Sequence, residues 1–302
     1  MVELLQRKVF SIVLGIILMF TVMPMAVYAD IGPKPSVVID FKGLEDEKYY
    51  VTLLSEIAST GPHSALGEHP GNQRYHEGDE DYEIWEKLLS YQDKDGYYFL
   101  QYFGECSETA QFTWGYYPPP KFKILIYFPA YDQFAVSGEA YERYAFHSYY
   151  STDVKGLELE SITPIENIEA VRNYDYTWEL ISLLARIIAT VAIEVLIALL
   201  FGFRAKKQLL LIGTVNVVTQ SILNILLNVI NYNQGSMMFV FNYIWMEFLV
   251  FVIEAGVYSA LLPKYSGKDL KRRWLIPFYA LVANAVSFGL GLYMAYLIPG
   301  IF

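Results

Sequence analysis

The sequence predicts an exported multi-pass membrane protein: a signal peptide, an extracellular mainly-β, sandwich-like domain with one helix, and a four-helix transmembrane bundle. Three observations lead to this prediction. A basic and then apolar segment comes first, an acidic tyrosine-rich stretch follows, and four long apolar runs come last. The composition agrees, because 54% of the 302 residues are hydrophobic and only 18% are charged, which is unusual for a soluble globular protein.

Residues 1–29 have the order of a secretory signal peptide. Two basic residues precede the apolar run Val9 to Val22, and a pattern of small residues that signal peptidase recognises ends at Ala29. The alternative is an uncleaved anchor helix, but the run is short for a membrane span and is closed by Pro24. The mature chain is therefore expected to begin at Asp30, outside the cytoplasm.

Residues 30–177 are expected to form the extracellular domain, which holds 26 acidic and 11 basic residues. Short aromatic and β-branched segments between Gly and Pro clusters predict strands, in either a small sandwich or a single sheet. These segments are residues 37–41, 49–54, 97–103, 122–128 and 141–150. Apolar residues at helical spacing in residues 79–90 predict one amphipathic helix. The polar residues 158–173 are expected to be a connector to the membrane.

The remaining chain, residues 178–302, is expected to be the transmembrane domain. Its four apolar runs are each long enough to cross about 30 Å of hydrocarbon at about 1.5 Å per residue. The runs are residues 178–203, 209–230, 237–262 and 274–298. The loops after the first and third runs are basic, and residues 231–236 carry no charge. Because basic loops stay in the cytoplasm, residues 30–177 and the C-terminus are expected to be extracellular.

Polar side chains within the apolar runs are costly in hydrocarbon and are therefore informative. Counted from the cytoplasmic ends, four of them lie at equal depth, roughly 12 to 15 Å above the inner boundary. They are Glu194, Asn216, Glu254 and Asn284, one from each predicted helix. At a second depth, Arg186 and Glu247 are expected to form an intramembrane ion pair.

Two interpretations of this polar layer stay open. The groups can simply hold the bundle together through interhelical hydrogen bonds, each contributing on the order of 1 kcal/mol. Alternatively, Glu194 and Glu254 have no basic residue at their height, and such a pair can share a proton or bind a cation.

A loop with three histidines is the candidate metal site of the outer domain. His63, His69 and His76 lie in a glycine-containing stretch with several carboxylates, side chains that zinc or another transition metal can use as ligands. The spacing matches no known motif, so a solvated polar loop without metal is the competing interpretation. No other cofactor is expected. The segment Asp93 to Gly96 predicts a turn rather than a calcium loop, because the flanking ligand positions are tyrosines.

The pattern of polar residues in the helices also carries a resemblance. It comprises Glu194 to Arg204, Asn216 to Gln220 with Asn224, Glu247 to Ala255, Ala283 to Ser287 and, at the mature start, Asp30 to Ser36. With these segments the chain resembles uncharacterised firmicute-type exported membrane proteins that have an outer domain and four transmembrane helices. The resemblance implies no activity; it implies only that the polar layer is a family feature.

The function expected from the sequence is a non-enzymatic sensing or interaction module on the surface of a bacterial cell. No nucleophile elbow, phosphate-binding glycine loop or dinucleotide fingerprint is present. The expected partners are the lipid bilayer and an extracellular protein, peptide or ion, and the net charge of −10 argues against nucleic acid. The alternative is a small proton- or cation-coupled transporter or channel that uses Glu194 and Glu254.

Overall fold

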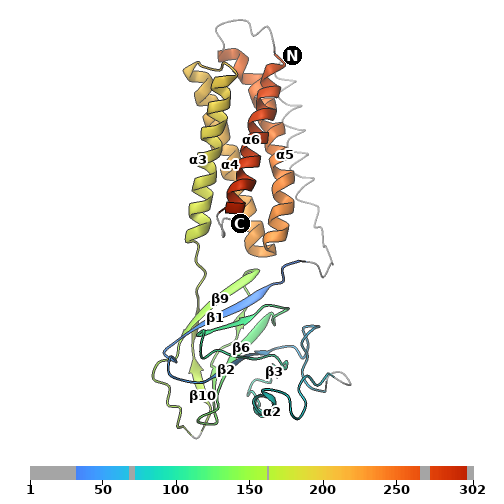
Figure 1. Ribbon diagram of the computed structural model, residues 1–302, viewed down its shortest axis with the longest axis vertical. Coiled ribbons are helices and arrows are strands. Elements are labelled where there is room, and N and C mark those ends of the chain that lie inside the picture. Colours follow the sequence, from blue (N-terminus) through green and yellow to red (C-terminus); the bar gives the residue numbers. More distant parts are fainter. Residues whose placement is uncertain (1–31, 68–71, 162, 266–272, 298–302) are drawn as a thin grey trace. The chain divides into compact units, whose positions relative to one another are not determined.

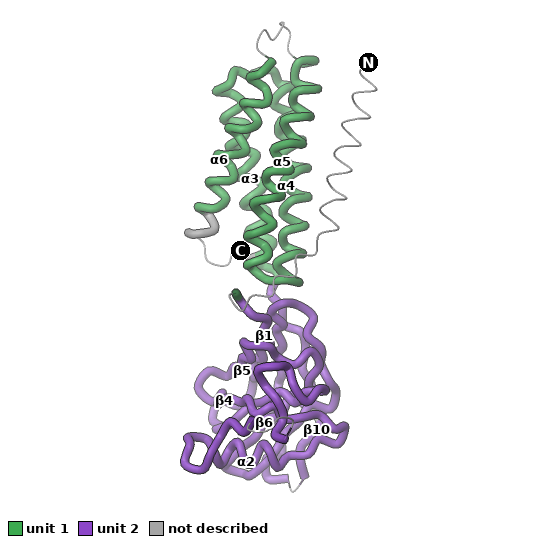
Figure 2. The backbone as a smooth tube through the Cα atoms, turned by 90° about the vertical axis from the view of Figure 1, so that its right-hand side faces the viewer, with its two compact units in different colours: residues 1–32, 176–302 green, residues 33–175 purple. Residues whose placement is uncertain are grey.

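The computed structural model describes residues 32–67, 72–161, 163–265 and 273–297. Two compact units are coloured separately in Figure 2, and residues 33–175 form one of them, while the helices from Tyr176 onward belong to the other. The proposed signal peptide, His69 and Arg272 lie outside the described residues.

The unit formed by residues 33–175 contains two β-sheets. The smaller has the strand order β11-β9-β1-β5, made of Ala170–Arg172, His147–Asp153, Ser36–Lys42 and Gln111–Trp114. The larger has the order β10-β7-β6-β2-β3, made of Ile165–Ile168, Gln133–Ser137, Lys121–Phe128, Tyr50–Ser55 and Tyr98–Phe99. Two short strands, β4 (Gly104–Glu105) and β8 (Tyr141–Glu142), extend it through β2 and β6. The domain is therefore β-rich, as predicted (Figure 1).

The two sheets share one hydrophobic core, which makes the unit a sandwich. Strand β6 shows why, because its side chains alternate between the two faces of the larger sheet. Phe122, Ile124, Ile126 and Phe128 are fully buried and belong to the same cluster as Val37, Ile39 and other side chains of β1, β5 and β9. The predicted apolar face of residues 122–128 is thereby confirmed.

The opposite face of the larger sheet is covered by helix α2, Tyr82–Ser90. Trp85 and Leu88 of the helix pack with Leu125 and Tyr127 of β6 in a second cluster. The predicted helix over residues 79–90 is present but begins at Tyr82, because Asp81 has a left-handed backbone with φ 61°. Strand β6 is thus buried on both sides, and the second layer of packing fixes it at the centre of the unit.

Several predicted boundaries are wrong. Residues 158–173 are not a simple connector, because they include β10 and β11, which complete one edge of each sheet. These strands were not predicted because they have only four and three residues. Residues 97–103 are extended only at Tyr98–Phe99, since Gln101 has φ 57° and its buried amide donates to the carbonyls of Ser64 and Asn72.

The segment Asp93 to Gly96 forms a turn, as predicted. The Gly96 amide donates to the Asp93 carbonyl at 3.0 Å, and the Asp93 carboxylate accepts from two backbone amides. Both Asp93 and Asp95 also accept hydrogen bonds from the ammonium group of Lys123 on β6. The side chains of Lys123 and Asp93 are only 2% and 1% exposed, so this is a buried ion pair.

The helical unit is a bundle of four long helices (Figure 1). They are α3 (Thr177–Leu200), α4 (Lys206–Gln234), α5 (Ser236–Leu261, continued by the 3₁₀ turn Leu262–Tyr265) and α6 (Leu275–Leu297). Each packs against two neighbours, in the cyclic order α3, α4, α5, α6. Within the described residues, these four helices are long and apolar enough to cross a membrane. Large apolar side chains on their outer surfaces, such as Ile188 and Leu200, suit contact with lipid.

The junction of α4 and α5 differs from the predicted loop over residues 231–236. Helix α4 continues to Gln234 and α5 begins at Ser236, so Gly235 alone separates them. Gly235 has φ 84°, a conformation that glycine adopts without the steric penalty of other residues. This tight reversal keeps the two helices side by side.

Candidate functional site

The interior of the bundle is polar along one face of helix α4. Asn216, Gln220 and Asn224 recur at intervals of four residues, which keeps them on the same side of a helix, and all three are buried. On α5, Glu247 and Glu254 are seven residues apart, also share a face, and are buried. The sequence spacing therefore places both sets inside the bundle.

The four residues predicted to lie at equal depth come together in what we call the midplane layer, defined by Glu194, Asn216, Glu254 and Asn284. The amide nitrogen of Asn216 donates to Glu194 Oε2 at 2.6 Å. The amide nitrogen of Asn284 donates to Glu254 Oε2 at 2.8 Å. Each of the four helices thus contributes one side chain to two carboxylate–amide pairs.

Hydroxyl groups that sequence reasoning missed complete the layer. Thr219 Oγ1 donates to Glu254 Oε1 at 2.6 Å, and Asn216 Nδ2 also donates to the Tyr258 hydroxyl at 2.8 Å. The hydroxyl of Tyr279 donates to the backbone carbonyl of Glu194 at 3.2 Å. Helical spacing is the signal that points to two of them, since Thr219 is three residues after Asn216 and Tyr258 is four after Glu254.

The midplane layer contains more hydrogen-bond acceptors than donors. Glu194 Oε1, Asn216 Oδ1 and Asn284 Oδ1 are buried, and none of them has a hydrogen-bond partner among the described residues. Carboxylate and amide oxygens can only accept, so these atoms cannot satisfy one another. A buried polar atom without a partner costs on the order of 1 to 3 kcal/mol, more when it is charged. A proton or cation in the layer removes that cost.

A second group of polar residues lies around Arg186. Its guanidinium donates to Asn224 Oδ1 at 3.3 Å and lies 5.4 Å from the ring centroid of Phe239. Asn224 in turn donates to the backbone carbonyl of Gln220 at 2.8 Å. Arg186 is also within range of a Coulombic attraction to Glu247. Direct pairing of Arg186 with Glu247 stays a prediction.

Charge reversal tests that pair. Arg186→Glu or Glu247→Arg alone is expected to reduce the amount of protein in the membrane, because each leaves like charges facing each other in a low-dielectric interior. The double reversal is expected to recover part of the loss, as measured by quantitative immunoblotting of membranes. Losses that simply add would show that the two side chains are not partners.

Of the three predicted metal ligands, the structure describes His63 and His76, and their surroundings differ. His63 is buried with its ring 5.0 Å from those of Tyr102 and Trp114, and its Nδ1 is 2.9 Å from the Arg74 guanidinium. Burial, reinforced by the charge of Arg74, lowers the pKa of His63 to about 4. His76 is exposed beside Asp79. The described part of the chain contains no group of three side chains that could hold a metal ion.

No protein-family model, no curated protein and no solved structure matches this chain.

Proposed function

We propose that this chain is a multi-pass membrane protein whose helical unit binds protons or a small monovalent cation in the midplane layer and works as a small proton- or cation-coupled transporter. The excess of buried, unpartnered oxygens in that layer supports the proposal most strongly. A positively charged species is the ligand that two carboxylates and two amide oxygens attract in a low-dielectric interior.

A purely structural role accounts less well for these contacts. Hydrogen bonds that only hold helices together pair each donor with an acceptor, as the amide nitrogen of Asn216 and one carboxylate oxygen of Glu194 do. Glutamine in place of Glu194 would keep the size and the hydrogen-bonding capacity without a charge in hydrocarbon. The carboxylates are therefore explained by a positively charged ligand rather than by packing alone.

The second proposal is the function expected from the sequence, a sensing or interaction module. In that case the outer domain binds an extracellular protein, peptide or ion and the bundle serves as an anchor. The two proposals differ in one measurable property, since only a transporter moves ions across a sealed bilayer. Neither proposal assigns an enzymatic activity.

Purified full-length protein in sealed liposomes provides that test. We expect it to dissipate an imposed pH gradient, or to take up radioactive sodium or a potassium analogue, faster than empty liposomes do. Liposomes that remain equally tight to protons, sodium and potassium would contradict the transporter and leave the interaction module as the better account.

The orientation is tested by cysteine labelling. We propose that the basic loops face the cytoplasm, so a cysteine at Lys206 or Arg272 should resist a membrane-impermeant maleimide on intact cells, while one at Asn233 should react. Cys106, the native cysteine, is buried in the sandwich core and gives a low background. Labelling at Arg272 together with protection at Asn233 would reverse the assignment.

A further inference from the structure

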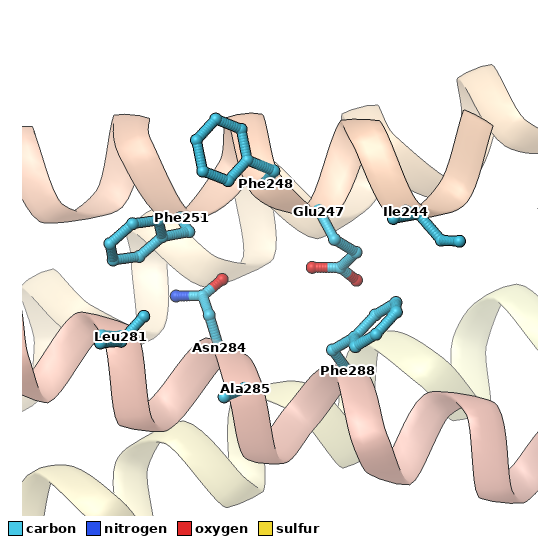
Figure 3. A pocket seen from close by; sticks show the side chains of 8 residues that line it. All are labelled: Ile244, Glu247, Phe248, Phe251, Leu281, Asn284, Ala285 and Phe288. Carbon is cyan, nitrogen blue, oxygen red and sulfur yellow. The ribbon is translucent and has the colours of Figure 1, made fainter. Parts of the chain in front are cut away.

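A cavity of about 210 Å³ lies between helices α5 and α6. Most of its wall is apolar and includes Phe248, Phe251, Leu281 and Phe288. The polar lining consists of Glu247 and Asn284. Figure 3 shows the carboxylate of Glu247 and the amide of Asn284 pointing into the space between the two helices, with Phe251 and Phe288 beside them. We call this cavity the lateral pocket.

The lateral pocket opens at the outer surface of the bundle. Ile244, Phe248 and Leu281, which line it, are 54%, 57% and 48% exposed. Exposed apolar side chains on a membrane-spanning helix face lipid. A molecule dissolved in the bilayer can therefore reach the pocket sideways.

The polar residues that line the lateral pocket can bind a hydrogen-bond donor or a positive charge. Glu247 Oε2 and Asn284 Oδ1 are buried, and the described residues provide neither with a hydrogen-bond partner. Both atoms only accept hydrogen bonds. A lipid acyl chain would fill the apolar part and leave both oxygens unsatisfied.

Arg186 does not occupy this position. It lines a separate cavity with Gln220, Asn224 and Tyr243, and the two cavities share no lining residue. Glu247 thus lines the lateral pocket, and among the described residues its Oε2 has no hydrogen-bond partner.

We propose that the lateral pocket binds a lipophilic organic cation that enters from the bilayer. Its ammonium group contacts Glu247 and Asn284, its aromatic body packs against Phe251 and Phe288, and an alkyl chain remains in lipid. Phenylalanine faces attract cations as well as apolar groups. The size fits, because a buried cavity of about 150 Å³ holds benzene, and 210 Å³ holds one ring with a small ammonium head.

A lipophilic organic cation is thus the substrate class of the proposed transporter. Only movement of the cation across the membrane rests on that proposed function, while its binding in the lateral pocket does not. Asn284 links the two sites, since its amide nitrogen donates to Glu254 in the midplane layer and the residue also lines the lateral pocket. Binding is measured at equilibrium and flux in sealed liposomes, so failure of one leaves the other to be judged separately.

The experiment uses full-length protein in lipid nanodiscs and radiolabelled benzyldimethyldodecylammonium. We expect saturable binding above that of empty nanodiscs. Glu247→Gln should weaken it by at least about tenfold, as expected for loss of a charged partner. Ala285→Phe should also abolish binding, because the added ring fills the pocket. Glu179→Gln, the same chemical change at the start of α3, is the matched control and should bind as the native protein does.

An uncharged probe with the same body, dodecyl benzyl ether, separates charge recognition from partition into lipid. It should show no saturable binding. The proposal is overturned if the ether binds as tightly as the ammonium, if binding of the ammonium never saturates, or if Glu247→Gln and Ala285→Phe bind like the native protein. Membrane yield and a single gel-filtration peak for each variant show that it is folded.

Discussion

Glu194→Gln and Glu254→Gln are each expected to slow the flux of protons or monovalent cations through reconstituted protein by at least about tenfold, the equivalent of about 1.4 kcal/mol. Each change keeps the size of the side chain and removes one of the two carboxylates that attract the ion. Thr219 and Asn284 both donate to Glu254, and glutamine keeps one oxygen that can accept such hydrogen bonds. Initial rates in sealed liposomes measure the change.

Glu179→Gln is the control for this comparison, since it lies on the same helix as Glu194, 15 residues earlier, and outside the midplane layer. It should leave the flux unchanged. The yields of all three variants should match the native protein, because glutamine removes a charge from hydrocarbon rather than adding one. Native rates in both layer variants would refute a role of the carboxylates in transport.

Lys123→Met is expected to lower the free energy of unfolding of the outer domain by about 3 kcal/mol or more, because it leaves the buried Asp93 without its cation. The domain, residues 30–175 expressed alone, should give a β-rich circular dichroism spectrum and unfold cooperatively in urea. Burial opposes the charged form of Lys123, but the hydrogen bonds that its ammonium group donates to Asp95 and Asp93 outweigh burial and raise the pKa of Lys123. This stabilisation is therefore present at neutral pH and lost as the pH rises through the folded-state pKa.

Lys121→Met provides the control two residues along the same strand. Lys121 pairs with Glu56 at the surface, and an exposed pair contributes little to stability. A loss of stability in Lys121→Met as large as that in Lys123→Met would contradict the account. A helical or coil-like spectrum of the native domain would contradict the β-sandwich itself.

The long apolar segments and the segments with a clear apolar periodicity were predictable from the sequence. The four apolar helices follow from the length of their apolar runs. The strand over residues 122–128 and the helix near Trp85 follow from periodicity, because burial of one face requires it. Strands β10 and β11 were missed, since each has four residues or fewer and their positions in the sheets depend on pairing with distant β7 and β9. Local sequence carries no record of such pairing.

The site was predictable to a similar degree. Depth counting identified Glu194, Asn216, Glu254 and Asn284, because rise per residue is constant in a helix. It could not reveal which amide faces which carboxylate, since that depends on how each helix is rotated. Nor could it reveal the lateral pocket, which arises where aromatic side chains of two neighbouring helices leave a space.

Infrared difference spectroscopy of the purified full-length protein tests the central claim most directly. The claim is that the midplane layer holds a proton or a small cation, so the carboxyl bands of Glu194 and Glu254 must respond when that ligand is exchanged. We predict that a change of pH or the addition of sodium or potassium shifts carboxyl bands of the native protein, and that Glu194→Gln and Glu254→Gln each remove part of the shift. Carboxyl bands that are identical in all three proteins after these exchanges would contradict the claim.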